Sequence, residues 1–519
     1  MKAKIKKTLK GFIAVLLSLV MILETWGGIS FVSKAATSTT TENGAIGTEF
    51  PEVPSGQSWS SYWPSYDFSA DEYYIETATQ FVNFARASRS HTFAGKTIHL
   101  AANINYETSS FAKASFGGIG SVNYPFCGTF NGHGYTITGL YSTSTGMFLH
   151  IGSTDYPATI KNFTIDGAKI SGAEGKAVVV SRFSGNPKNS SKNIKIADVT
   201  VTNSTASFTG NNCGIIAGRC QSDNQAITIT GCKVSNTSLI CTASTTTNIT
   251  QWGMIIGKDY SSGYSRISDC IVTGSSIAST NCNINRVGLV AGFLCGATQV
   301  DSCTVSSSSL TCGLNTATVT KEVGGIVGSL KSGYGKITNC SVSGTTITTK
   351  GLSQYVGLLA GHIYGGTIQS NTVSSSTINA NYNASNTQAS RIGGMIGNIS
   401  SATATISSCS ASGIKINNAS RVNCIGGLVG NIESASAGTT ITDTKISDSY
   451  IYNKYPNILK DGIPYVEAQY FLEENRGAET SLSGDKLTIK LADMEFVLTA
   501  GQTKYEYKKG IFLHERLRI

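Results

Sequence analysis

The carboxylates are the first side chains in this sequence that could do chemistry. Sugar hydrolases and lyases use acidic residues in pairs around one sugar, or clustered with Ca²⁺ and a base. Asp198, Asp269 and Asp443 occupy one recurring place in the chain, directly before a position that holds cysteine in several repeats. Elsewhere the same place holds Asn162, Asn339, Ser302 and Ser408. Exchange of Asp with Asn and Ser is typical of a turn whose side chain bonds nearby backbone, so we expect a turn position here and no catalytic residue.

The histidines and glycine-rich strings also give no chemical site. The six histidines are His91, His99, His133, His150, His362 and His514. None stands at metal-ligand spacing from another or from a cysteine, and His133 fits a turn at 131–134. The glycine strings lack the Lys-Ser/Thr of a phosphate loop, and no Gly-x-Ser-x-Gly elbow with a plausible base is present. We therefore expect no metal and no cofactor.

Five of the thirteen cysteines share one slot in the string (Ile/Val)-x-x-Cys-x-Val-(Ser/Thr). They are Cys232, Cys270, Cys303, Cys340 and Cys409. Other copies of the string carry Phe163, Val199, Asn371 or Thr444 there, which a redox or metal role would not accept. Stacked slots about 4.8 Å apart exceed the usual Cβ–Cβ distance of a disulfide. We expect these five to be mostly free, buried thiols that act as small apolar side chains in the core. The cysteines outside the slot could form some disulfides within a coil.

A row of aromatic and cationic residues is a stronger candidate for binding. It follows a second recurring string, and stacking of the repeats would align it along one edge. Aromatic faces hold sugar rings and cations attract anionic glycans; a solvated row of turns is the alternative. The candidate residues are Tyr260, Tyr264, Tyr334, Tyr364, Arg182, Arg219, Lys258 and Lys331.

The elements that would position these residues come from the second string, Gly-x-(Ile/Leu/Met)-x-Gly. Its glycine pairs recur every 33–39 residues: Gly214 and Gly218, Gly253 and Gly257, Gly288 and Gly292, Gly324 and Gly328, Gly357 and Gly361, Gly393 and Gly397, Gly426 and Gly430. A third segment with a lone aliphatic follows the cysteine slot. Three short strands per repeat that cannot bury their apolar residues alone predict an all-β fold, a parallel β-helix or solenoid. A β-propeller is the alternative, although its blades need four strands.

Composition agrees with such a fold. The chain has 519 residues, of which only 14% are charged, and Ser, Thr and Asn fill most polar positions. This excludes typical disorder and a mostly helical protein. The net charge of +9 is misleading, because six lysines and one glutamate in the first 35 residues contribute +5 and leave +4 for the rest. We therefore expect no nucleic acid partner.

Domain boundaries follow from these patterns. A basic segment, an apolar run and a small-x-small site predict a signal peptide at 1–35, hence a secreted or cell-surface protein without a transmembrane segment in the mature chain. We expect a flexible leader at 36–68 and a cap with the first strands at 69–130. That cap includes a helix opened by the capping box Thr77-x-x-Gln80, with the first strand at Thr97. The β-helix follows at 131–455, and alternating strands at 486–498 predict a hairpin in a C-terminal module, 456–519, where the sequence stops abruptly.

The segment Phe130-Asn-Gly-His-Gly-Tyr-Thr-Ile-Thr-Gly-Leu-Tyr141, followed by Gly-Gly-(Ile/Leu)-Val-Gly units, resembles bacterial surface proteins with GLUG-type repeats. The resemblance covers roughly 70–452. It implies right-handed β-helical stalks or adhesins of Gram-positive cells, often without catalytic activity, although the chain has no Leu-Pro-x-Thr-Gly sorting signal. We expect a non-catalytic adhesin or stalk whose partners are cell-wall or host glycans or surface proteins. The alternatives are a β-helix polysaccharide lyase or glycoside hydrolase and, more weakly, ice or mineral binding through threonine rows.

Overall fold

The computed structural model describes residues 48–453 apart from 112–113, 154, 186–193, 221–225, 245–247, 262, 280, 314–318, 351, 354, 381–389 and 419–423. Beyond 453 it describes six strands between 458 and 509. The predicted signal peptide and the beginning of the predicted leader lie outside the described residues. No helix in the described part of the chain is long and apolar enough to cross a membrane.

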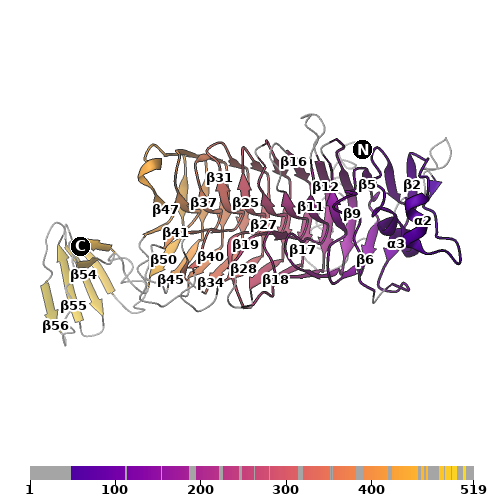
Figure 1. Ribbon diagram of the computed structural model, residues 1–519. Coiled ribbons are helices and arrows are strands. Elements are labelled where there is room, and N and C mark those ends of the chain that lie inside the picture. Colours follow the sequence, from indigo (N-terminus) through magenta and orange to yellow (C-terminus); the bar gives the residue numbers. More distant parts are fainter. Residues whose placement is uncertain are drawn as a thin grey trace, which may run out of the picture. The chain divides into compact units, whose positions relative to one another are not determined.

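The described chain is a β-solenoid of parallel strands, each of which pairs with its equivalent in the next coil (Figure 1). One coil runs through β16 (Ile227–Thr230), β17 (Lys233–Ser235), β18 (Ser238–Cys241), β19 (Asn248–Gly253) and β20 (Ile256–Asp259). Pairing between repeats rather than within them excludes the propeller alternative. The coil has five strands in four sheets instead of the three expected, because both recurring strings contain a corner that divides them into two strands.

Two of the sheets meet at the glycine string. The nine-stranded sheet consists of β8 (Phe148–Ile151), β11 (Val180–Phe183), β15 (Ala217–Cys220), β20, β25 (Ala291–Cys295), β31 (Val327–Lys331), β37 (Ala360–Ile363), β42 (Ile396–Ile399) and β47 (Val429–Ile432). The seven-stranded sheet consists of β14 (Cys213–Gly214), β19, β24 (Asn283–Gly288), β30 (Val323–Gly324), β36 (Tyr355–Gly357), β41 (Arg391–Gly393) and β46 (Cys424–Gly426).

The third aliphatic segment forms a ten-stranded sheet, and the cysteine string forms the longest sheet. The former comprises β7 (Tyr141–Ser142), β10 (Lys169–Gly172), β13 (Thr205–Phe208), β18, β23 (Ser276–Ser279), β28 (Ser309–Cys312), β34 (Thr346–Thr349), β40 (Thr377–Ala380), β45 (Lys415–Asn418) and β50 (Tyr450–Asn453). The 22-stranded sheet comprises β1 (Thr48–Glu49), β2 (Glu72–Ile75), β3 (Thr97–Leu100), β4 (Ile104–Asn105), β5 (Thr129–Asn131), β6 (Thr136–Thr138), β9 (Thr159–Asp166), β12 (Ile194–Thr202), β16, β17, β21 (Arg266–Ser268), β22 (Ile271–Thr273), β26 (Gln299–Asp301), β27 (Thr304–Ser306), β32 (Lys336–Thr338), β33 (Ser341–Ser343), β38 (Gly366–Gln369), β39 (Thr372–Ser374), β43 (Ala404–Ser407), β44 (Ser410–Ser412), β48 (Thr440–Thr442) and β49 (Lys445–Ser447). A further two-stranded pair joins β29 (Val319–Thr320) to β35 (Leu352–Ser353).

The corner in the cysteine string is a column of left-handed residues. Each stands directly before the slot, with φ between 49° and 63°, a region that Gly, Asn and Asp enter more readily than other residues. Its members are Asn162, Asp198, Gly231, Asp269, Ser302, Asn339, Ser370, Ser408 and Asp443. The carboxylates of this column are therefore corner residues, as the exchange of Asp, Asn and Ser predicts.

The cysteine slot lies inside the coil at that corner. All five slot cysteines are buried and are free thiols. The Sγ–H of Cys340 donates to the carbonyl of Thr338 at 3.2 Å, and Cys270 and Cys409 each bond the carbonyl two residues earlier in the same way. In the coil that carries Asn371 instead, the buried amide donates to the Ile337 carbonyl at 2.8 Å and accepts from the Cys340 amide at 2.9 Å. Phe163 and Val199 are buried in the same slot of other coils although neither can donate a hydrogen bond, so the slot accepts apolar side chains as well as groups that bond a nearby carbonyl.

The glycine string forms the other corner because it lets two backbones touch. A Cβ added to Gly253 would lie 2.3 Å from the Ile256 carbonyl oxygen, and one on Gly292 would lie 2.4 Å from the Trp252 amide nitrogen of the preceding coil. Neither position leaves space for a side chain.

The N-terminal coils hold the helices. α3 (Ala78–Ala87) begins with the predicted capping box, in which Thr77 accepts from the Gln80 amide. The part of the predicted flexible leader that is described belongs to this fold, because β1, α2 (Trp59–Tyr62) and η1 (Trp63–Ser65) lie within it and Phe50, Trp63 and Phe68 are buried together. β1 and β2 also precede β3, so the expected first strand at Thr97 is the third in the parallel stack. Aromatic packing outweighed the Ser- and Pro-rich composition of this segment.

The C-terminal region forms antiparallel pairs. β54 (Lys486–Leu491) pairs with β55 (Met494–Thr499), which confirms the predicted hairpin. β53 (Glu479–Ser483) and β56 (Glu506–Lys509) complete a four-stranded sheet, and β51 (Ile458–Lys460) pairs with β52 (Ile463–Tyr465). A short helix, η2 (Ser434–Ser436), precedes β48.

Candidate ligand-binding edge

Three of the four cations predicted to line one edge form a continuous row on the nine-stranded sheet. Arg182 of β11 pairs with Arg219 of β15, and Arg219 pairs with Lys258 of β20. Parallel strands place these residues about 4.8 Å apart along the solenoid axis. The same row, called here the edge row, runs through His150, Arg182, Arg219, Lys258, Phe293, Ser329, His362, Asn398 and Asn431.

The first part of the edge row carries an excess of positive charge. Arg182, Arg219 and Lys258 of this row are called here the basic strip together with Lys176, which precedes β11 and acts electrostatically on His150 of the row. Among the described residues one carboxylate, Glu174, lies within 4 Å of these cations, with Oε1 3.0 Å from Arg219 Nη1. The strip and Glu174 together carry four positive charges and one negative charge, a sum of +3. Glu174 also accepts from the Asn212 amide at 3.0 Å, which holds the carboxylate and Arg219 in place.

The protonation behaviour of the strip reflects both burial and crowding. Burial, followed by repulsion from Arg182, lowers the pKa of Lys176 and of Arg219. Burial, followed by repulsion from Arg219, lowers the pKa of Lys258. Burial, Arg182 and Lys176 lower the pKa of His150 to about 4, so this histidine is neutral at neutral pH. Repulsion between neighbouring cations thus adds to the effect of burial at this end of the edge row.

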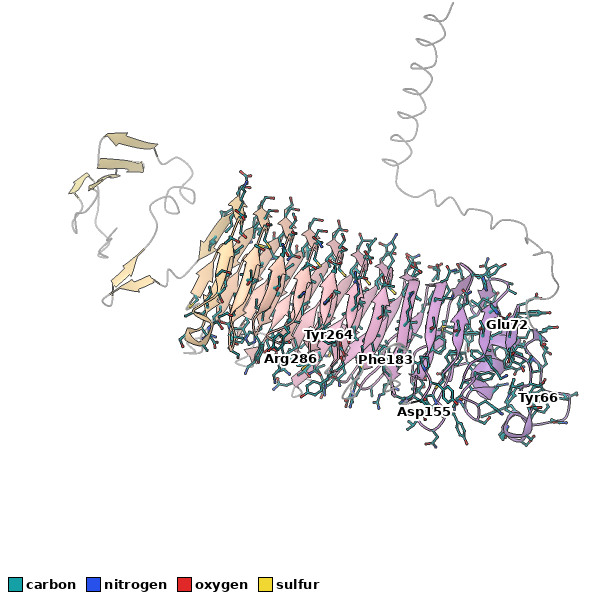
Figure 2. All side chains as sticks on the ribbon, turned by 90° about the horizontal axis from the view of Figure 1, so that it is seen from above. Tyr66, Glu72, Asp155, Phe183, Tyr264 and Arg286 are labelled. Atoms are coloured by element: carbon teal, nitrogen blue, oxygen red, sulfur yellow. The ribbon has the colours of Figure 1, made fainter. Side chains whose placement is uncertain are left out.

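The tyrosines of the candidate edge differ in exposure. Tyr264 is 78% exposed and Tyr334 is 82% exposed, and Figure 2 labels Tyr264 near the middle of the stack with Arg286 of the following coil. Each tyrosine stands two residues before a strand of the long sheet, β21 or β32, and β26 lies between those strands. Tyr264 and Tyr334 therefore belong to coils that are separated by one intervening coil. Both present a ring to solvent.

Tyr260 connects the tyrosines to the basic strip. Its ring is 43% exposed and stacks on Phe293 with 6.1 Å between ring centres. Lys258 Nζ lies 5.0 Å from the centre of the Tyr260 ring. The structure thus places a half-exposed aromatic face directly beside the last cation of the strip.

Lys331 and Tyr364 do not join the strip. Lys331 pairs with Cys295, two positions beyond the edge row, and lies 5.9 Å from the Tyr364 ring centre. Lys331 stands three residues after its glycine, whereas Arg219 and Lys258 directly follow theirs. The predicted single row therefore divides into two groups, and the spacing from the glycine is the signal that separates them.

Beyond Phe293, His362 of the edge row belongs to a hydrogen-bonded relay that spacing alone did not reveal. Glu322 Oε1 lies 3.1 Å from His362 Nδ1, and His362 Nε2 lies 2.7 Å from Ser400 Oγ. Burial alone would raise the pKa of Glu322, but the hydrogen bond from His362 and the charge of Arg286 bring it below its ordinary value. Each partner comes from a different coil, about forty residues apart in sequence, so only the register of stacked strands unites them.

The relay has the order of groups that serine hydrolases use, carboxylate to imidazole to hydroxyl. The side chains of Glu322 and His362 are each only 6% exposed, and His362 lies between the Tyr355 and Tyr364 rings at 4.7 and 4.5 Å. The next coils continue with a paired network in which Arg391 bonds Glu433 at 2.7 Å and Asn398 at 3.3 Å. Charge in this half of the row is thus paired, in contrast to the basic strip.

Two histidines that spacing kept apart meet on the long sheet. His99 Nδ1 lies 2.7 Å from His133 Nε2, and His99 Nε2 lies 3.4 Å from Glu72. The glutamate and His133 contact opposite nitrogens of His99, so the three do not converge on one point. In the described part of the chain no group of three or more His, Cys, Asp or Glu is placed to hold a metal ion.

Comparisons with known proteins give two findings. A family model described as the GLUG motif matches residues 320–348, a segment that contains Gly324, Gly328 and the slot residue Cys340. Among solved structures, a protein from Bacteroides ovatus assigned provisionally as an immunoglobulin A1 protease matches with a TM-score of 0.35 and 17% identity, over 54% of this chain and 77% of that one. Comparison with curated protein sequences gives no match. The chain is thus a β-solenoid that matches the GLUG motif over residues 320–348.

Proposed function

We propose that this protein is a secreted or cell-surface, non-catalytic β-solenoid that acts as an adhesin or structural stalk and binds glycans along its edge row. The observation that supports glycan binding is the set of exposed tyrosine faces, Tyr260, Tyr264 and Tyr334, of which Tyr260 lies beside the last of the stacked cations. Sugar rings pack on aromatic faces through their apolar side while cations contact polar or acidic substituents. A stack of coils suits a stalk, because each coil contacts only its neighbours and the structure therefore extends in one direction as coils are added.

A glycan array tests this proposal. For the glycans that the native protein binds on the array, the variant with Tyr260→Ala, Tyr264→Ala and Tyr334→Ala should have an affinity that is lower by about tenfold or more. The reason is that each aromatic contact contributes about 0.5–1.5 kcal/mol to binding. Tyr450→Ala is the matched control, because Tyr450 is as exposed as Tyr260 but lies on the ten-stranded sheet. Native binding by the triple variant, with an unchanged melting temperature, contradicts the proposal.

A second candidate function, hydrolysis of an ester, is favoured by the Glu322–His362–Ser400 relay. In that reaction His362 Nε2 takes the proton of Ser400 as its Oγ bonds the ester carbon, and then returns the proton to the departing alcohol. Water afterwards releases the acid from the serine. The relay offers less to a glycoside hydrolase or lyase, which needs carboxylates facing a sugar.

A fluorophosphonate probe decides this candidate. An active relay should give covalent modification of Ser400 that disappears in His362→Gln, with Ser401→Ala as the control for the neighbouring hydroxyl. Absence of modification on Ser400 in the folded native protein rules out the hydrolase.

A further inference from the structure

We propose that the basic strip binds a linear acidic polysaccharide, whose repeated carboxylate or sulfate groups face Lys176, Arg182, Arg219 and Lys258. This inference rests on the proposed glycan binding along the edge row and names the class of glycan. Charge, geometry and the neighbouring aromatic ring each point to it.

The positive charges of the basic strip outnumber the carboxylates that contact them. Over three successive coils the strip has a sum of +3, with Glu174 as the carboxylate in contact among the described residues. The following coil pairs Arg286 with Glu322, and the coils after that pair Arg391 with Glu433. The excess charge therefore begins at Lys176 and ends at Lys258, and it is bounded by paired charge on the C-terminal side.

The geometry argument concerns repetition along the axis. Strand pairing places Arg182, Arg219 and Lys258 on successive rungs about 4.8 Å apart, so a linear chain laid along the edge row meets one cation per rung. The Arg219 side chain is only 23% exposed and is held by Glu174, so little side-chain freedom is lost when an anion binds. A guanidinium also matches the two oxygens of a carboxylate or sulfate.

The aromatic argument separates an acidic sugar from other polyanions. Tyr260 presents its ring beside Lys258, with Phe293 stacked behind it. An acidic sugar can place its ring on Tyr260 and its anionic group on Lys258, whereas polyphosphate has no ring to place there. Burial is the larger cause of the lowered pKa of His150 and of Lys258, and repulsion from the neighbouring cations of the strip adds to it.

The test is a set of titrations of the full-length protein at several salt concentrations. The probes are heparin as a sulfated chain, polygalacturonate as a carboxylated chain, dextran as a neutral chain and single-stranded DNA. The triple variant Arg182→Gln, Arg219→Gln, Lys258→Gln should weaken binding of the acidic glycans at least tenfold. The salt dependence of binding should also flatten, because a protein with fewer cations releases fewer counterions from the glycan when it binds. The matched control is Lys195→Gln, Lys233→Gln, Lys336→Gln, which removes the same charge from exposed lysines of the long sheet.

Glu174→Gln provides a variant that a folding defect cannot imitate. Removing the strip's carboxylate should tighten binding of the acidic glycans severalfold while leaving dextran unaffected. A tightening of this kind supports the strip as the site, and an unchanged or weaker affinity counts against it.

The remaining outcomes separate this inference from the proposed function. Equal binding of dextran and the acidic chains overturns the acidic class but leaves glycan binding intact, whereas binding of no glycan overturns both. Equal losses in the strip and control variants show attraction by overall charge and overturn the site. If single-stranded DNA binds as tightly as the glycans and is lost in the same variant, the strip is a general polyanion site and the acidic-glycan inference fails.

Discussion

At the scale of single residues, Asp259 is the most unusual side chain of the solenoid. It ends β20 with its carboxylate fully buried. Oδ1 accepts from the Ser261 amide at 3.1 Å and Oδ2 from the Thr298 hydroxyl at 3.3 Å. Burial is the largest influence and raises the pKa of Asp259, although these hydrogen bonds oppose the rise. The folded protein therefore holds this proton more tightly than the unfolded chain does.

The sign of this shift predicts how stability depends on pH. For a carboxyl whose pKa is raised on folding, stability is greatest below the unfolded pKa and is lost as pH rises through the folded pKa. Asp259→Asn removes the ionisation, so it should melt at a higher temperature than the native protein at pH 7, with a smaller difference at pH 4. Asp269→Asn, at an exposed left-handed corner, is the control and should show no such pH dependence. A less stable Asp259→Asn protein at pH 7 would contradict the prediction.

Two cysteines outside the recurring slot approach one another more closely than unbonded sulfurs do. Cys241 Sγ of β18 lies 2.6 Å from Cys282 Sγ of the next coil. Because a disulfide has its sulfurs about 2.05 Å apart, a small movement joins them. In an oxidising compartment we expect a Cys241–Cys282 cross-link, visible by mass spectrometry of unreduced peptides, while slot residues such as Cys270 remain open to alkylation after unfolding. Full alkylation of Cys241 and Cys282 without reduction would contradict this.

What sequence reasoning could reach at this scale depended on recurrence. The cysteine slot and the Asp/Asn/Ser corner recur once per coil, so their burial and their turn conformation were predictable. Glu322, His362 and Ser400 each occur once and stand in three different columns. Their contact depends on which positions of neighbouring coils face one another, and the bend of the chain at the glycine corner determines that.

At the scale of strands, the glycine corner should be intolerant of any side chain. In Gly292→Ala the new Cβ would lie within 2.6 Å of backbone atoms from two other segments, Trp252 and Gly257. We expect a loss of about 1–3 kcal/mol or more in the free energy of unfolding, since backbone cannot move aside as a side chain can. Denaturant unfolding measures the loss.

Gly333→Ala is the matched control for this corner. Gly333 lies in an exposed turn, where the nearest atom to an added Cβ is the Ala402 Cβ at 3.5 Å. Its effect should stay within about 0.5 kcal/mol. Equal effects of the two substitutions would show that the glycine string does not act through close packing.

The strands also show where pattern reading stops. The cysteine string and the glycine string each predict one extended strand, because hydrophobic residues continue through the corner. The structure confirms the extended conformation but divides each string into two strands. A left-handed Ser302 or Asn339 produces a bend without any change in hydrophobic pattern. The coil therefore gained two strands that periodicity did not distinguish.

At the scale of the whole solenoid, the N-terminal aromatic cluster closes one end of the parallel stack. Phe84 of α3 is fully buried and contacts Phe50, Phe93, Phe126 and Phe130. Phe84→Ala should cost about 3–5 kcal/mol in this region. Because each coil contacts only its neighbours, hydrogen exchange should accelerate in β2 and β3 while amides of β37 keep their protection. Equal acceleration in all coils would show that the solenoid unfolds as one unit.

The overall architecture was the most predictable property, since two strings with one period require stacking. The N-terminal boundary was not. The sequence predicts a flexible leader up to residue 68, but the aromatic residues Phe50 and Phe68 pack against Phe93, a contact that local composition does not reveal.

The one-rung-per-coil arrangement also bears on how such a molecule can change over generations. Duplication or deletion of a complete coil adds or removes one position in every row and leaves all remaining neighbours in register. The number of coils then sets how far the protein reaches, while the residue in each row sets what it can hold. Reach and specificity can vary independently, because an altered rung such as Phe293 in place of a cation leaves the pairing of its strand unchanged.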